Sequence, residues 1–574
     1  STVAAGHSDP AAIEQERHVL PPRVYAVIAG RLAQLSPPAR KVAELGAAIG
    51  RAFTLDMLLH AGQDDKVTTV HALDELWQKR IIREQSANVF DFTHDKLREV
   101  AYAEISAPHR RLLHHHIAQA LEALNTDSLD PVSAQIAAHH ERAGLFEQAL
   151  PYYHRAGIVA ANMYAHDDAI NLLTRGLALL SQLRPSQQRD AQELALLIAL
   201  ASLYRIAKGM GSSDLERTVL RAHELGKKIG NVALLAETLF VLQNLYVITA
   251  QFDKVFEIET ELGTLLERSG NLPFPLRKLN IAVATMYNTG QFVQAHGLFE
   301  EIFAVRDDQS IGQLYALMGF NYYLGAQVAN AHALWFLGFP QKALAQVQEG
   351  TRVADDFQHP FGQAMAAAYL AMLQEFRADA DTFRVQAEAA LAVSSQHHAA
   401  YYQVWSNFLF QFAQAWQQPT ADNLAHARAA VRLFAENGTR LRMPYYLSLL
   451  TRVLHKAGRL DEALATLEQA FAESRRNDEH WWDAELYRLR GELKWAQGAD
   501  ADEVEAAFRR ALEIARSQQA KSLELRTATS LARLWHATSR SEKARGLLTP
   551  LYSWFTEGFD TPDLQAARSL IAQL

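Results

Sequence analysis

The stretch FDFTHDKLREVAY, residues 90–102, places a histidine beside an aspartate, His94 and Asp95, just before a helix-like run. A histidine next to a carboxylate can serve as a general base, ligate a metal or contact a phosphate. Catalysis would also need a nucleophile, and a zinc site would need further ligands at helical spacing. Neither accompanies the pair, so we expect a role in binding or switching.

Other catalytic motifs are missing from the sequence as well. Neither KGMGSSD nor ELGKKIG supplies the Gly-x-x-x-x-Gly-Lys-Ser/Thr loop that cradles phosphates, and no Gly-x-Ser-x-Gly or His-Glu-x-x-His motif is present. His114, His115 and His116 follow one another on a predicted helix and point about 100° apart, so they do not converge on one ion. The same holds for the histidine pairs at 139–140 and 397–398. We therefore predict that this chain has no catalytic residue, no metal site and no cofactor of its own.

Composition indicates a large folded protein with several parts. At 574 residues the chain is too long for one compact core, so several domains or a repeat array are expected. Its net charge of -8 argues against a chain-wide nucleic-acid surface. The sequence contains no apolar run long enough to predict a membrane span. The absence of cysteine fits a cytoplasmic location. Residues 1–21 lack an initiating Met and a signal-peptide core, so we expect a linker at the cut edge of a longer chain.

Residues 22–124 are predicted to form a small domain of mixed elements. Helical spacing in RVYAVIAGRLAQL, PPARKVAELGAAIG and DKVTTVHALDELWQKR is followed by IIREQ and VFDFT, which predict a two-stranded hairpin, and then by a helix from His94. This order is typical of a winged-helix domain, although a generic small α+β domain fits it as well. The segment that would read DNA offers only Lys66 and the pair Lys79 and Arg80. A recognition helix brings more cations to phosphates, so direct DNA binding is not expected.

Residues 130–574 are nearly all helix-forming and repeat one motif. Each copy has a small residue, an apolar residue four positions later and a small or apolar residue three beyond that. The clearest copy is AGRLDEALATLEQAF, with Gly458 in the turn. This pattern predicts a mainly α protein in which an α-solenoid (superhelix) of tetratricopeptide-type helix pairs follows the small domain. The copies begin at Ala149, Ala295, Ala343, Val385, Ala427, Ala463, Val504 and Ala544.

Aromatic and polar residues recur within the clearest repeats. One interpretation is that the rings fill the grooves between helices as core. The other is that they line a concave surface that binds a ligand or peptide, with arginine and asparagine supplying polar contacts. The candidate groove residues are Asn321, Tyr322, Tyr323, Trp335, Tyr401, Tyr402, Trp405, Arg440, Arg442, Tyr445, Tyr446, Trp481 and Trp482.

Several stretches resemble the bacterial signal-transduction ATPases with numerous domains (STAND). FDFTHDKLREVAYAEISAPHRRLLHHHIAQALE is similar to their winged-helix signature and to the helix that enters the repeat array. IAAHHERAGLFEQALPYYHRAGIVAANMYAHDDAINLL resembles their first repeats. MPYYLSLLTRVLHKAGRLDEAL and WWDAELYRLRGELKW are similar to repeats attached to class III nucleotide cyclases and bacterial transcription activators. The resemblance covers nearly the whole chain and implies that an ATPase module and an effector lie upstream.

The resemblance also implies a role for the opening motif. In related nucleotide switches, including plant immune receptors, a Met-His-Asp motif contacts the ADP β-phosphate and keeps the resting state closed. Here THDKLREVA matches His-Asp and the helix, with Thr93 in place of Met. His94 would meet a phosphate at the positive helix end, and Asp95 would cap the helix or orient His94. A local cap without a ligand remains the alternative.

Together, these features predict the sensor region of a STAND-type regulatory ATPase. Its solenoid would bind an inducer or a protein partner, releasing an ADP-bound form so that ATP-driven self-association activates an effector. A free-standing tetratricopeptide scaffold for peptides, and the non-catalytic tail of a cyclase or kinase, remain as alternatives. ADP and ATP are implied only for the upstream module.

Overall fold

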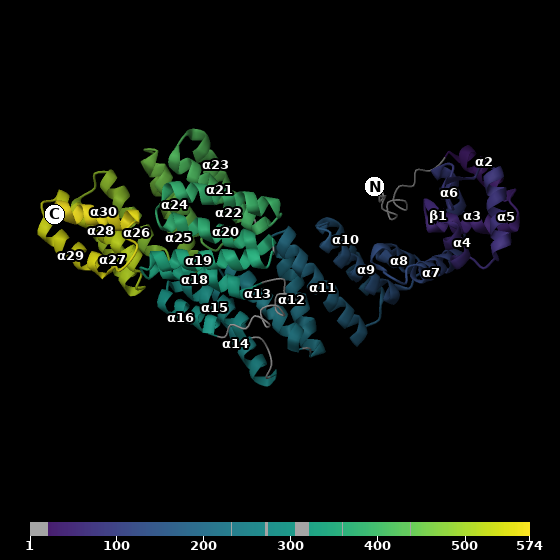
Figure 1. Ribbon diagram of the computed structural model, residues 1–574, viewed down its shortest axis with the longest axis horizontal. Coiled ribbons are helices and arrows are strands. Elements are labelled where there is room, and N and C mark those ends of the chain that lie inside the picture. The colour runs from purple at the N-terminus through teal and green to yellow at the C-terminus, as the bar shows by residue number, and fades with distance from the viewer. Residues whose placement is uncertain (1–20, 231, 270–273, 305–320, 359, 437) are drawn as a thin grey trace. The chain divides into compact units, whose positions relative to one another are not determined.

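The computed structural model describes residues 21–230, 232–269, 274–304, 321–358, 360–436 and 438–574 (Figure 1). The chain divides into two compact units, Ser1–Ala199 and Leu200–Leu574. The predicted boundary near residues 124–130 lies inside the first unit, because one helix there packs on the small domain and on the first repeat alike. Within the described parts of the chain, no helix combines the length and apolarity needed to cross a membrane.

The small domain contains the predicted helices and hairpin and one further strand. Strands β2 (Ile82–Ser86) and β3 (Val89–Phe92) form the hairpin, and β1 (Ala52–Thr54) pairs with β3 in an antiparallel sheet of order β1-β3-β2. The sequence analysis missed β1 because three residues are too few to show alternation. The helices are α2 (Pro22–Ala33), α3 (Pro37–Ile49), α4 (Leu55–Ala61), α5 (Lys66–Gln78), α6 (Asp95–Ala103) and α7 (Ala107–Leu124).

Antiparallel helices follow without a further strand in the described residues. In the first unit they are α8 (Ser133–Arg142), α9 (Phe146–Asn162), α10 (His166–Leu179) and the start of α11 (Gln187–Ala207). In the second unit, α12 (Ser213–Ile229) precedes a series of helical hairpins, each with an inner and an outer helix. The inner helices are α13 (Val232–Ile248), α15 (Phe274–Thr289), α18 (Tyr322–Phe336), α20 (Pro360–Phe376), α22 (Ala400–Gln417), α24 (Met443–Lys456), α26 (Asp483–Ala496) and α28 (Lys521–Ala537). The outer helices are α14 (Phe252–Ser269), α16 (Phe292–Ala304), α19 (Pro340–Asp356), α21 (Ala380–Gln396), α23 (Ala421–Glu436), α25 (Leu460–Asn477), α27 (Ala501–Ser517) and α29 (Ser541–Trp554), and α30 (Pro562–Gln573) ends the chain.

This arrangement confirms the predicted mainly α fold with an α-solenoid of tetratricopeptide-type helix pairs. In the outer helices from α16 to α29, the fourth residue is buried and faces the inner helix of its pair. From Ala343 onward these positions are 40, 41, 39, 41 and 40 residues apart, which is longer than the usual tetratricopeptide period. They are Ala343, Phe383, Leu424, Ala463, Val504 and Ala544.

One predicted copy of the motif is wrong in its register. Val385, expected to start the copy in α21, is 49% exposed. The buried residues of this helix are instead Phe383, Ala387 and Ala390. The side chain of Asp379 caps the helix, so α21 begins at Ala380 and its inner face starts two residues earlier than predicted.

The second unit folds back on itself, so that hairpin turns far apart in the sequence are bonded to each other. The carbonyl of Ile248 accepts hydrogen bonds from the backbone N–H groups of Arg440 and Leu441, both at 3.0 Å. One repeat further along, the side chain of Asn288 donates to Asp478. We call this line of contacts, from Ile248 and Asn288 to residues 440–441 and 478, the closing seam.

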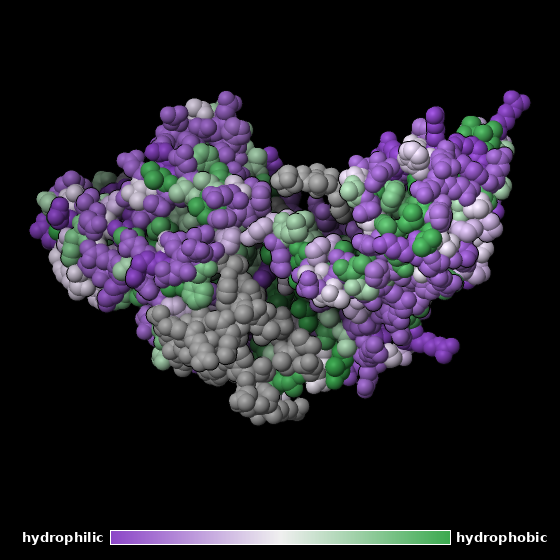
Figure 2. Space-filling view, turned by 45° about the vertical axis from the view of Figure 1, so that its right-hand side comes forward, coloured by the Kyte–Doolittle hydropathy of each residue, from purple (hydrophilic) through white to green (hydrophobic). Residues whose placement is uncertain are grey.

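Closure buries one inner helix on all sides. Every residue of α18 is buried, although an inner helix of an open solenoid would keep one face exposed. One core cluster runs through the inner helices from α13 to α26, and a separate cluster joins α27, α28, α29 and α30. The visible outer face is mostly hydrophilic, with apolar side chains in small groups (Figure 2).

Candidate functional site

The predicted His-Asp pair lies at the junction between the hairpin and α6. His94 is the N-cap residue, with extended backbone angles of φ -144 and ψ 137, and its side chain makes no capping hydrogen bond. Asp95 is the first helical residue, so the expectation that Asp95 caps the helix is wrong. Its carboxylate still lies in the first turn, where the helix dipole favours negative charge. Both side chains are exposed, and His94 is available for an external contact.

Thr93, which stands where the resembled motif has Met, has a structural role. Its backbone N–H donates to the carbonyl of Ile81 at 2.9 Å, and its hydroxyl donates to the carbonyl of Arg80 at 2.9 Å. Arg80 follows the C-cap of α5 and has a positive φ of 53. A methionine could not make the hydroxyl bond, so this threonine ties the end of the hairpin to the end of α5 and fixes the backbone just before His94.

The outward face of α5 differs from that of a DNA-reading helix. Val67 is 64% exposed and Trp77 is 62% exposed on this helix, with Val70 and the acidic Asp74 between them. Reading of a DNA groove depends on cations that neutralise phosphates. The absence of direct DNA binding by the small domain stays a prediction.

Two histidine runs that are far apart in the sequence meet where α7 packs on α8. The Nδ1 atoms of His114 and His139 lie 2.9 Å apart, and the Tyr102 hydroxyl lies 2.8 Å from Nε2 of His114. Burial lowers the pKa of His114 to about 3 and lowers the pKa of His139 well below its usual value, so both rings are neutral. Among the described residues, no group of three or more His, Asp or Glu side chains is placed to hold a metal ion.

The predicted groove residues do not form an open surface in this structure. Twelve of the thirteen are buried, and the rings of Trp405, Trp481 and Trp482 are fully buried. Arg440, the exception, contributes its backbone N–H to the closing seam. Burial fits the interpretation of these rings as core in the closed superhelix. Their role in binding a ligand or peptide stays a prediction.

Four of the predicted groove residues cap a helix or pack against neighbouring helices. Asn321 is the N-cap of α18, and its side-chain oxygen accepts from the N–H of Leu324 at 3.0 Å. The ring of Tyr323 packs edge-on against Phe303, with centroids 5.6 Å apart, and Tyr322 lies beside it in the core. Trp335 stacks on Phe376, with centroids 5.0 Å apart.

Other members of the set converge on a single buried cation, Arg442. Its Cζ lies 4.2 Å from the centroid of Trp405 and 4.7 Å from that of Tyr287. Its Nε donates to the Tyr287 hydroxyl and one terminal nitrogen donates to the Tyr369 hydroxyl, both at 2.9 Å. Tyr401 and Tyr446 are also close enough to contribute to the raised pKa of Arg442. We call these residues the arginine centre: Arg442, Tyr287, Tyr369, Tyr401, Trp405 and Tyr446.

The backbone of Arg442 explains how the guanidinium is held. Arg442 is the N-cap of α24 with a left-handed φ of 68, which costs a non-glycine residue energy. Its N–H donates to both carboxylate oxygens of Glu479, at 2.8 and 3.0 Å. The indole N–H of Trp481 donates to the same carboxylate at 2.6 Å. Burial raises the pKa of Glu479 to about 8.

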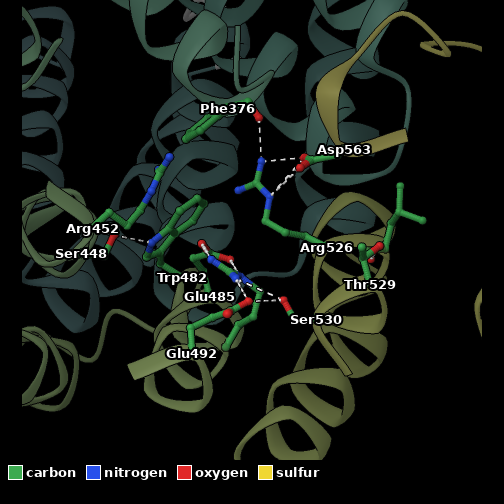
Figure 3. Close-up of polar contacts among 12 residues, drawn as sticks. Phe376, Ser448, Arg452, Trp482, Glu485, Glu492, Arg526, Thr529, Ser530 and Asp563 are labelled. Atoms are coloured by element: carbon green, nitrogen blue, oxygen red, sulfur yellow. Dashed lines mark hydrogen bonds and ion pairs between the residues drawn. The ribbon is translucent and has the colours of Figure 1, made fainter. Parts of the chain in front are cut away.

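A second polar network lies on the neighbouring inner helices and includes Glu485, Glu492 and Arg526 (Figure 3). Arg526 donates to the carboxylate of Asp563 at 2.7 Å and to the carbonyl of Phe376 at 2.9 Å. Arg488 pairs with the buried Glu485 at 2.8 Å. Every arginine of this network has a carboxylate partner; its ion pairs are Arg452 with Glu375, Arg488 with Glu485 and Glu492, and Arg526 with Asp563.

Sequence reasoning missed three residues at these sites. Tyr287 reaches Arg442 across 155 positions of sequence, which only the closing seam makes possible. Tyr369 comes from α20, where surrounding alanines gave no aromatic cluster to notice. Glu479 stands among other charged residues, shortly before Trp481 and Trp482. The aromatic residues that follow it are the one sequence feature that could indicate its burial.

Comparison with known proteins gives a remote relative and several helical-repeat structures. No family model matches the chain. An uncharacterized protein of Rhizobium meliloti (strain 1021) is 24% identical over 518 residues, covering 89% of this chain; the chain spans 50% of the length of that relative.

Three solved structures illustrate the likeness of fold. The Rap protein complexed with competence and sporulation factor is 11% identical, with a TM-score of 0.44 over 67% of this chain and 100% of that one. The Cut9–Hcn1 hetero-tetramer of the APC/C is 13% identical, with a TM-score of 0.48 over 81% and 88%. A STAND protein with a tetratricopeptide repeat sensor from Pyrococcus horikoshii is 10% identical, with a TM-score of 0.30 over 86% and 66%. At these identities and TM-scores, the likenesses carry no argument about function.

Proposed function

We propose that this chain is the regulatory sensor region of a STAND-type signal-transduction ATPase. In this proposal, residues 22–124 form a winged-helix domain that contacts a nucleotide held by an upstream module. The superhelix binds an inducer or a protein partner, and binding releases the ADP-bound form so that self-association activates an effector.

One observation carries this proposal: an exposed histidine stands at a helix N-terminus, in the domain that leads into the repeats. The order helix, strand, helix, helix, hairpin, with the sheet order β1-β3-β2, supports a winged helix. His94 lies two residues after the last strand and is the N-cap of α6, so its exposed imidazole stands beside the N-terminus of this helix. A phosphate could accept hydrogen bonds from both.

The surroundings of His94 fit one contact to a nucleotide and no more. The side chain is exposed, and Thr93 fixes the backbone before it through two carbonyls. The neighbouring Asp95 carries a negative charge, which disfavours a phosphate placed close to it. The cradle that holds most of the phosphate charge would therefore have to come from the upstream module, and His94 would add a contact that reports on the nucleotide state.

The proposal is tested in the full-length natural protein by the rate at which a fluorescent ADP analogue dissociates. Replacing His94 with alanine removes the contact, so ADP should dissociate faster and basal effector output should rise. His71→Ala is a matched control, because His71 is an exposed histidine of the same domain, on α5. Equal dissociation rates and equal basal output in the wild type and both variants would refute the proposed role of His94.

A further inference from the structure

Within the described ranges, Arg442 is a buried positive charge without a counter-charge at its guanidinium. Its side chain is 1% exposed, and its described hydrogen-bond partners there are neutral tyrosine hydroxyls. Among the described residues, no carboxylate oxygen forms an ion pair with it. A buried charge is costly unless it is paired, so native proteins place a partner beside it. The arginines of the neighbouring network, each with a carboxylate, show that this protein follows the rule elsewhere.

Glu479 does not fill this role although it is the nearest acid on the chain segment that meets Arg442. Both of its oxygens accept from the backbone N–H of Arg442, and one also accepts from the indole of Trp481. Burial also raises the pKa of Glu479 to about 8, which favours its neutral form. Glu479 is therefore engaged by other donors and makes no ion pair with the guanidinium of Arg442 in the described residues.

A second unfilled group lies on the ring that contacts the guanidinium. Trp405 is fully buried, and its indole Nε1 has no hydrogen-bond partner in the described part of the chain. Buried N–H donors in native structures are nearly always satisfied, by protein, water or a bound ligand. A donor and a cation on adjacent groups are the two features that an anion's oxygens need.

The arginine centre also lies directly behind the closing seam. Arg440 and Leu441, the two residues before Arg442, donate to Ile248 across the seam. Asp478, the residue before Glu479, accepts from Asn288. Opening of these few hydrogen bonds would loosen the packing around Arg442, and an anion bound to its guanidinium would favour closure.

We propose that the arginine centre is a binding site for a small carboxylate anion, held by the guanidinium of Arg442 and the indole N–H of Trp405. A single positive charge calls for a monoanion rather than a phosphate dianion, and the planar guanidinium matches the two oxygens of a carboxylate. Aromatic walls on several sides suit a carboxylate with an apolar body. This inference rests on the proposed sensor function and names the chemistry of its inducer.

The experiment uses the full chain and three probes: phenylacetate, its neutral isostere phenylacetamide, and inorganic phosphate. Thermal unfolding and tryptophan fluorescence report binding. Phenylacetate should raise the unfolding temperature and change the fluorescence, whereas phenylacetamide and phosphate should do neither. Equal effects of the acid and its amide, a larger effect of phosphate, or no effect of phenylacetate would each overturn the proposal.

Two variants separate binding from folding. Trp405→Phe keeps a ring beside the guanidinium and removes a donor that has no partner, so the unliganded chain should unfold at nearly the same temperature. Its affinity for phenylacetate should fall about tenfold or more, because a hydrogen bond to a charged group is lost. Trp416→Phe, on the same helix, contacts Arg452 and Lys456 rather than Arg442, and should leave the affinity unchanged. An equal loss in both variants would contradict the assignment.

Arg442→Gln should abolish the phenylacetate effect, provided that circular dichroism shows a folded chain. If Arg442→Gln does not fold, the affinity of Trp405→Phe for phenylacetate decides whether the site is assigned correctly.

Failure of this inference is distinguishable from failure of the sensor role. If phenylacetate has no effect but His94→Ala speeds ADP release, the sensor function stands and the ligand chemistry is wrong. If phenylacetate binds and ADP release is unchanged, the site stands and the nucleotide link is wrong.

Discussion

The paired histidines between α7 and α8 predict that this part of the molecule loses stability in mild acid. His114 and His139 share a hydrogen bond while both are neutral, and Arg142 and Arg110 nearby further oppose protonation of His114. The folded-state pKa of His114 is about 3, against 6.5 for an unperturbed ring. The unfolded chain therefore takes up a proton first as the pH falls below 6.5, and stability declines from there toward pH 3.

The size of the effect follows from the same two values. About 1.5 pH units below the unfolded pKa, at roughly pH 5, the unfolded ring is protonated and the folded one is not, which corresponds to about 2 kcal/mol for His114 alone. His139 shifts in the same direction and adds to this loss. Because His114 is only 1% exposed, solvent screening gives little reason to reduce this figure.

Hydrogen exchange of the α7 and α8 amides, corrected for the intrinsic pH dependence of exchange, measures this loss in the full chain. Protection should drop between about pH 7.5 and pH 5 in the wild type. The double variant His114→Gln and His139→Gln should lose most of that dependence, whatever its absolute stability. His71→Ala, which removes an exposed histidine, should keep it in full. Protection that is independent of pH in the wild type, or a dependence that survives in the double variant, would refute the reasoning.

Three further predictions concern the second unit. Gly211→Ala should destabilise the closing seam by about 1–3 kcal/mol in thermal unfolding, because the added Cβ would lie 2.8 Å from the backbone of Gly438. The control is Gly546→Ala, whose Cβ meets no atom within 4 Å and should not destabilise the chain. Equal effects of the two variants would contradict a close-packed seam. If the register of α21 is as described, Phe383→Ala should lower the free energy of urea unfolding by about 3–5 kcal/mol and Val385→Ala by less than about 1 kcal/mol. A larger loss in Val385→Ala than in Phe383→Ala would instead support the register predicted from the sequence. Burial raises the pKa of Glu479 from 4.5 to about 8, so the stability that its protonated form gives is fully present below about pH 4.5 and is lost as the pH rises toward 8. Glu479→Gln should remove this decline between about pH 4.5 and 8, and a decline that persists in the variant would place its origin elsewhere.

The outer helices could be predicted from the sequence because each has one buried face. All of the recognised motif copies, such as those at Ala295 and Ala463, lie on α9 or on outer helices. Their opposite sides are exposed, so apolar and polar residues alternate with helical period. The register is wrong in α21, where small alanines on both faces leave the phase ambiguous without the cap at Asp379. In α23 the predicted copy begins at the buried Ala427, three residues after the equivalent position Leu424.

The inner helices gave no comparable signal, for a physical reason. α13 and α18 are buried on most or all sides by the closing seam, so their sequences are apolar all round and lack a helical period. Between residues 175 and 290 the repeat motif is correspondingly hard to recognise in the sequence. Closure itself rests on backbone carbonyls such as that of Ile248, which any residue type supplies.

The candidate sites were predictable to different degrees. His94 was found because two adjacent polar residues interrupt an apolar run, and the structure places it at the expected strand-to-helix junction. The cap assigned to Asp95 failed because neighbours one residue apart are interchangeable in a sequence pattern. Arg442 was noted among tyrosines, but its partners Tyr287 and Tyr369 come from distant helices. Only the fold brings them together.

The most direct test of the proposed function is hydrogen exchange in the full-length natural protein at the start of α6, compared between the ADP-bound and ATP-bound states. If His94 and the first turn of α6 contact the ADP phosphates, the amides of residues 94–97 should be protected with ADP and should lose that protection with ATP. His94→Ala should exchange at the unprotected rate in both states. Exchange at residues 94–97 that is the same with ADP, with ATP and without nucleotide would contradict the account.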